Sequence, residues 1–123
     1  MPVIQGPRNH THELPHARFY SLATPSRGSS ETCVWRVQLT SGLETAPHTL
    51  TREEIFVVLS GSARVVLGGE TSVAETGDVI VVPPNTEVSL SCASDRAEVL
   101  CCLPVGGQAR IGDGPAFTPP WAE

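Results

Sequence analysis

One histidine and one carboxylate are the leading candidates for chemistry in this chain. His48 follows Pro47, and Glu54 comes six positions later, next to the apolar run at residues 55–59. An imidazole and a carboxylate can serve as general base and general acid, and both groups also bind transition metals. On neighbouring short strands they would meet at the mouth of an apolar sheet. We therefore predict a site built on His48 and Glu54.

The same two residues support different kinds of function. Without a metal, His48 and Glu54 could move a proton on a small substrate, as in an isomerase, an epimerase or a cyclase. A polar pair can also be inherited and do no chemistry, because a buried charged pair adds little net stability. The residues alone therefore leave open whether the protein is an enzyme or a non-catalytic binding or sensing module.

Short strands must hold these residues in place. Polar and apolar side chains alternate over residues 32–40, while residues 54–59 and 79–82 are rich in β-branched types. The chain of 123 residues contains 11 glycines and 11 prolines, which favour frequent turns. This pattern predicts an all-β sandwich or barrel. Further strands are expected at residues 19–22, 46–50, 63–67, 71–74, 87–92 and 97–103.

The chain is long enough for one domain with one core. Residues 1–18 are polar and are expected to form an N-terminal arm, residues 19–103 the barrel, and residues 104–123 a tail. The tail carries Phe117 and Trp121, which are large apolar side chains. We expect it to pack on the barrel or on a partner chain.

A homodimer is predicted from two features. Residues 79–82 are apolar on both strand faces, so we expect both faces to be covered. The aromatic tail also indicates surface that is buried in an assembly.

Composition excludes several classes of partner and location. The formal net charge is −5, and the eight basic residues are all arginines with no basic run, so no nucleic-acid partner is expected. The N-terminal residues lack the apolar segment of a secretory signal, and no apolar run is long enough to span a membrane. The four cysteines match no zinc-binding pattern. We expect a cytoplasmic protein with reduced thiols.

Gly42, His48, Glu54 and Gly61 form one set of spaced residues, and Gly77 and Pro83 belong to a second set further along the chain. In these residues the sequence resembles the first and second motifs of the cupin superfamily of small β-barrels. This resemblance implies a double-stranded β-helix, or jelly-roll barrel, of about ten short strands. It also implies a homodimer, which is common among family members.

Half of the usual metal ligands of that family are missing. Cupins that bind metal usually use three histidines and one glutamate that point into the barrel. Leu50 and Val88 stand where two of these histidines would be, and Asn85 replaces a motif glycine. His48 and Glu54 alone would hold a divalent transition metal weakly, because catalytic metal sites usually have three or more protein ligands.

Three sources could complete such a metal site. One is a cysteine thiolate, and a second is the pair His10 and His12 from the same or a partner chain. The third is a chelating substrate bound together with the metal at His48 and Glu54. A metal-dependent enzyme of the oxygenase type is therefore an alternative function.

The barrel cavity is the expected binding site for a small-molecule ligand or substrate, whose identity the sequence does not give. Beside His48 and Glu54, we expect an arginine to bind a ligand carboxylate if its side chain faces inward. The predicted wall residues are Leu50, Phe56, Val58, Val88 and Arg36.

Overall fold

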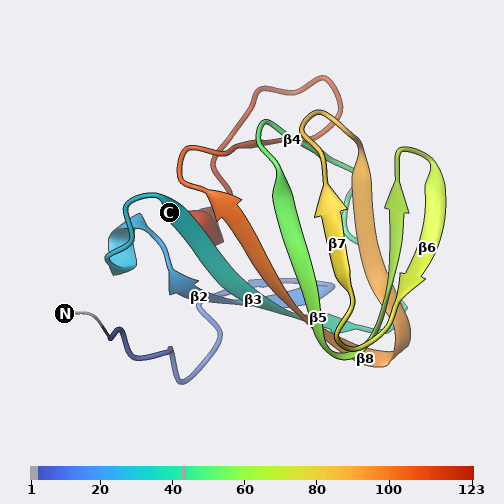
Figure 1. Ribbon diagram of the computed structural model, residues 1–123, viewed down its shortest axis with the longest axis horizontal. Coiled ribbons are helices and arrows are strands. Elements are labelled where there is room, and N and C mark those ends of the chain that lie inside the picture. Colours follow the sequence, from blue (N-terminus) through green and yellow to red (C-terminus); the bar gives the residue numbers. More distant parts are fainter. Residues whose placement is uncertain (1–2, 43) are drawn as a thin grey trace.

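The computed structural model describes residues 3–42 and 44–123. These residues form an antiparallel β-barrel with two short 3-10 turns (Figure 1). The strands are β1 (His12–Leu14), β2 (Ala17–Ala23), β3 (Thr32–Thr40), β4 (Thr49–Leu50), β5 (Glu54–Leu67), β6 (Glu70–Ala74), β7 (Val79–Val82), β8 (Val88–Pro104) and β9 (Ala109–Arg110), and the 3-10 turns are η1 (Pro25–Arg27) and η2 (Pro120–Ala122). One sheet runs β1-β2-β3-β8-β5-β6 with β7 also paired to β5, and β4 pairs with β9. The predicted all-β fold class is confirmed.

Two long strands, β5 and β8, replace four of the predicted short ones. The first part of β5 pairs with β7 and the second half of β8, and its last part pairs with β6 and the start of β8. The predicted break between strands 54–59 and 63–67 is wrong, because the strand continues through Gly61 with shifts in register. Gly61 has φ +68, and a side chain there would collide with the carbonyl oxygen of Arg96. This is a bulge that only glycine fits.

Alternation along the strands separates an inner face from an outer face. On β3, residues Cys33, Trp35, Val37 and Leu39 are buried, which is the alternation that the sequence predicts. On β7, Val79 and Val81 are 56% and 50% exposed. The prediction that both faces of this strand are covered is therefore wrong for the single chain.

The strand β1 and the C-terminal tail both lie against the barrel. Part of the predicted N-terminal arm joins the sheet, because β1 pairs with β2. The tail arches over one end of the barrel and returns beside β2 and β3 (Figure 1). The ring of Trp121 stacks on Phe19 at 3.7 Å between centroids, and the Ser21 hydroxyl donates to the Trp121 carbonyl at 2.7 Å. The tail thus packs on its own barrel.

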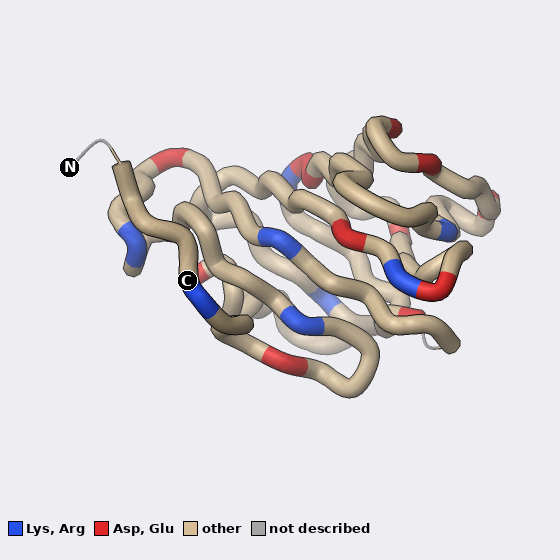
Figure 2. Tube along the Cα trace, turned by 90° about the horizontal axis from the view of Figure 1, so that it is seen from below, with Lys and Arg blue, Asp and Glu red and all other residues tan. Residues whose placement is uncertain are grey.

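Charged residues are spread over the molecule. Figure 2 shows basic positions separated from one another along the trace, with acidic positions between them.

Within residues 3–42 and 44–123, no helix is long and apolar enough to cross a membrane.

Because Gly61 forms a bulge and Gly69 does not, alanine should lower the stability of the fold by different amounts at these two positions. Gly69 also has positive φ (+84), but a side chain there meets nothing within 4 Å. Gly69→Ala should lower the free energy of unfolding by about 1–2 kcal/mol from backbone strain alone. Gly61→Ala adds a collision with backbone and should cost roughly 3 kcal/mol or more. Urea unfolding of both variants measures this, and equal losses would contradict the bulge geometry.

Candidate functional site

An apolar cavity of about 150 Å³ lies within the barrel. Its wall contains all three phenylalanines and both tryptophans of the chain, which are Phe19, Trp35, Phe56, Phe117 and Trp121. Its ionisable imidazole and carboxyl groups come from His16, His48 and Glu54. The cavity is therefore an aromatic chamber with few polar groups.

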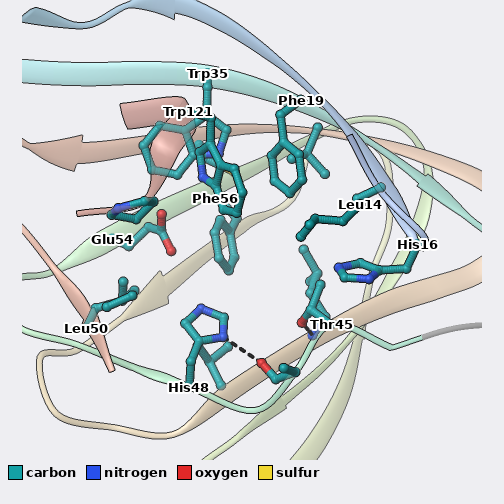
Figure 3. A pocket seen from close by; sticks show the side chains of 18 of the residues that line it. Leu14, His16, Phe19, Trp35, Thr45, His48, Leu50, Glu54, Phe56 and Trp121 are labelled. Carbon is teal, nitrogen blue, oxygen red and sulfur yellow. Dashed lines mark hydrogen bonds between the residues drawn. The ribbon is translucent and has the colours of Figure 1, made fainter. Parts of the chain in front are cut away.

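Glu54 places a carboxyl group in this chamber. It is the first residue of β5 and lies on the same strand face as Phe56 and Val58, which are buried. Only 3% of Glu54 is exposed, and no hydrogen bond or ion pair to its carboxyl occurs among the described residues. In Figure 3 the carboxyl points into the space between the labelled side chains. Its hydrogen-bonding capacity is thus free for a ligand.

Burial determines the protonation state of Glu54. Desolvation raises the pKa of this carboxyl from 4.5 to about 8, because an apolar wall disfavours the charged form. At neutral pH the group is mainly a neutral carboxylic acid that can donate a hydrogen bond. The neighbouring Cys101 thiol also has its pKa raised, first by burial and then by Glu54. Cys101 is therefore a thiol and not a reactive thiolate.

His48 presents a basic nitrogen to the same cavity. Its backbone pairs with Val88, with hydrogen bonds of 3.1 Å and 2.8 Å that fix the position of the residue. Its Nδ1 lies 2.8 Å from the carbonyl oxygen of Ala46. A carbonyl only accepts hydrogen bonds, so Nδ1 carries the proton and, in the neutral ring, Nε2 carries a lone pair. Figure 3 shows this second nitrogen facing the cavity.

The two groups do not bond to each other. The structure shows neither a hydrogen bond nor an ion pair between His48 and Glu54. They lie on different sides of the cavity (Figure 3). The geometry brings both predicted residues to one space, where they can contact a ligand between them rather than one another.

The predicted wall residues divide into two groups. Leu50, Phe56 and Val88 line the cavity, whereas Val58 is buried in the core beyond the wall. The assignment of Arg36 to the wall is wrong. Strand alternation puts its side chain on the outer face of β3, where it pairs with Glu98 and lies 3.9 Å from the Tyr20 ring centroid.

The residues around this cavity do not fit a metal site. Leu50 and Val88 occupy two motif positions with apolar side chains, and no group of three or more His, Cys, Asp or Glu residues suited to a metal occurs within the described part of the chain. His10 and His12 do not line the cavity, and their rings lie edge-on to Tyr20 and Trp121 at 6.4 Å. The described residues around the cavity therefore offer too few ligands for a metal.

Sequence reasoning missed several wall residues. His16 belongs to the polar segment 1–18 that is expected to form an arm, but it lines the cavity, and burial lowers the pKa of its imidazole. Trp35 could have been found, because the alternation over residues 32–40 puts it on the buried face. The contributions of Phe117 and Trp121 depend on where the tail returns, which no local pattern specifies.

Comparison with known proteins agrees with the barrel geometry. A family model described as "Cupin domain" matches residues 35–103. No curated protein sequence is significantly similar to this chain.

Two solved structures illustrate the likeness in fold. A salicylate 1,2-dioxygenase variant from Pseudoaminobacter salicylatoxidans, in complex with gentisate, superposes with a TM-score of 0.70 at 22% identity, over 82% of this chain and 30% of that one. KdgF from Halomonas sp. gives a TM-score of 0.70 at 20% identity, over 79% of this chain and 86% of that one. This chain thus spans less than a third of the dioxygenase. At such identities the likeness concerns the fold.

The buried carboxyl predicts an unusual pH dependence of stability. In the unfolded chain Glu54 ionises near pH 4.5, but in the folded protein it ionises near 8. Between these values the folded state holds a proton that the unfolded state has released, so rising pH destabilises the fold. The loss should be on the order of a few kcal/mol, at about 1.4 kcal/mol for each pH unit.

Urea unfolding between pH 5 and pH 9, roughly the range between the two pKa values, measures this effect. Glu54→Gln should remove the Glu54 part of the slope, whereas Glu87→Gln, at an exposed position, should leave it. Parallel curves for the wild type and Glu54→Gln would contradict the raised pKa.

Proposed function

This chain belongs to the cupin domain family, and we propose that it binds a small molecule in its barrel cavity and moves a proton on it with His48 and Glu54. The reaction class is that of an isomerase or a cyclase. The observation that carries the proposal is the Glu54 carboxyl, which faces the cavity while buried and without a protein partner. A buried polar group of this kind costs stability unless water or a ligand satisfies it.

The two residues have complementary roles in this proposal. Glu54, as a neutral acid, donates a hydrogen bond to an oxygen of the ligand. His48, whose Nδ1 is held by the Ala46 carbonyl, accepts a proton at Nε2. A general base positioned in this way typically accelerates a reaction by about 100-fold to 10,000-fold.

A carbonyl compound shows how the step would balance. A C–H bond next to the carbonyl breaks, and its proton goes to His48 Nε2. The electron pair forms an enol-type double bond, and the developing negative charge on oxygen is stabilised by the Glu54 hydrogen bond. In a carbonyl compound that carries a second double bond between its β and γ carbons, the imidazolium then returns the proton to the γ carbon, and the second double bond moves to the α,β position. The product is an isomer, and no oxidant or reductant is needed.

Cytoplasmic location is a further part of the proposal. All four cysteines are free in the structure. Cys101 and Cys102 are adjacent on β8 and point to opposite faces of the strand, so they are poorly placed to form a disulfide with each other. A reducing compartment fits these thiols.

We also propose that two copies pack through the outer face of β5, β7 and β8. Cross-strand neighbours on that face are apolar: Ile55, Val57, Val79, Val81, Leu100 and Cys102. On the adjoining part of the outer face, Arg36 and Glu98 pair with each other, so two copies can approach without net repulsion. Face-to-face packing of two sheets would cover this surface.

Proton exchange on small ketones tests the catalytic part. In D₂O, the protein should accelerate exchange of the protons next to the carbonyl of acetone, butanone or cyclohexanone, measured by proton NMR. His48→Gln should lower the enzymatic rate by roughly 100-fold or more, because no base remains at that position. His10→Gln is the matched control, since this exposed histidine lies outside the cavity.

Two results would overturn the catalytic proposal. One is unchanged exchange in His48→Gln, and the other is no acceleration by the wild type with any of the three ketones. Ketone binding without exchange would assign the cavity to a non-catalytic binding or sensing module.

A charge on the outer face tests the dimer. Val81→Arg should convert a dimer into a monomer in sedimentation velocity, because a buried unpaired charge is costly. Val73→Arg is the control, since Val73 is also exposed (48%) but lies on β6. A wild-type protein that sediments as a monomer, or a dimer that survives Val81→Arg, would contradict this interface.

A further inference from the structure

We propose that the occupant of the cavity is an uncharged molecule built on a single ring, with an oxygen substituent directed at Glu54. This inference rests on the proposed small-molecule site and specifies its ligand class. Four features of the cavity carry it: the character of the wall, the volume, the distribution of charge and the unpartnered carboxyl of Glu54.

The wall favours a flat, apolar ring. Every phenylalanine and tryptophan of the chain contributes to it, although they come from distant parts of the sequence. Phe19 and Trp121 stack nearly parallel, with 8° between their planes. Aromatic faces and edges pack well against another ring, with a gain beyond simple burial of area.

The volume sets the size of the occupant. The cavity measures about 150 Å³. An engineered apolar cavity of about 150 Å³ in another protein stays dry and takes up benzene. One six-membered ring therefore fills this space. A fused bicyclic molecule would exceed this volume.

The charges around the cavity disfavour a charged ligand. No arginine lines the cavity and the chain has no lysine, so a carboxylate or a phosphate would find no permanently charged cation in the wall. Arg36, the arginine expected in the wall, is held on the outer face by Glu98. Burial also shifts wall groups of both kinds toward their neutral forms: it raises the pKa of Glu54 and lowers that of His16. An apolar wall penalises a ligand of either charge in the same way.

The polar end of the ligand is defined by Glu54. The carboxyl has no protein partner, and a neutral acid offers one donor together with acceptor capacity. A hydroxyl or carbonyl oxygen on the ring can satisfy it. The rest of the ring then lies among the aromatic side chains, within reach of His48.

Four probes with the same ring test the inference at pH 7: benzyl alcohol, toluene, benzylamine and benzoate. Both tryptophans line the cavity, so their fluorescence reports occupancy. Isothermal titration gives independent affinities. Benzyl alcohol should bind at least about tenfold more tightly than the cationic amine or the anionic benzoate, because neither ion finds compensation.

Substitution of Glu54 tests the polar contact. Glu54→Leu should weaken binding of benzyl alcohol by about threefold to tenfold while leaving toluene unchanged, since only the alcohol loses a hydrogen bond. Glu54→Gln should retain most of the affinity for the alcohol, because an amide also donates. Glu87→Leu, at an exposed position, is the matched control.

The outcomes separate this inference from the proposed function. Tightest binding of benzylamine would assign an organic cation to the site, and tightest binding of benzoate an anion. Either result overturns the ligand class while proton exchange on ketones can still be observed. An equal loss of affinity for benzyl alcohol and for toluene in Glu54→Leu would show that no specific polar contact exists. If none of the four probes binds, the inference is overturned. If ketone exchange is also absent, the proposed function is overturned as well.

Discussion

The register of β5 is the constraint on which the site depends. Phe56 and Val58 are buried, and strand alternation then directs Glu54 to the same inner face. A slip of one residue would bury Ile55 and Val57 instead and would expose Phe56. Burial of a phenylalanine or valine side chain contributes about 1.5–3 kcal/mol. Two such side chains can offset the cost of holding a neutral carboxyl away from water.

The poor fit of this cavity to a metal and the chemistry of Glu54 have a common physical cause. Leu50 and Val88 are buried at the cavity wall. Apolar side chains at these positions remove coordinating atoms, and they also exclude water from the carboxyl. The wall that disfavours a metal site therefore also makes Glu54 a neutral hydrogen-bond donor. His48 complements it, because the Ala46 carbonyl leaves Nε2 as the acceptor.

Short sequence patterns predicted the features that depend only on residues close together in the chain. The spacing of the motif residues predicted that His48 and Glu54 share one site, and the alternation over residues 32–40 predicted that Trp35 is buried. Arg36 was assigned to the wall although the same alternation puts it outside. The strands predicted at 54–59 and 63–67 are one strand in the structure, because sequence does not distinguish a turn glycine from a bulge glycine such as Gly61. The positions of His16 and the tail depend on long-range packing, which no short pattern encodes.

The protonation state of Glu54 at neutral pH is the central claim, and isotope-edited infrared difference spectroscopy measures it directly. With labelled glutamate, the wild-type protein at pH 7 should show the carbonyl stretch of a protonated carboxylic acid, and this band should be absent from Glu54→Gln. Such a band would establish a neutral acid inside the cavity. A spectrum with carboxylate bands alone, unchanged by Glu54→Gln in the protonated region, would contradict the account.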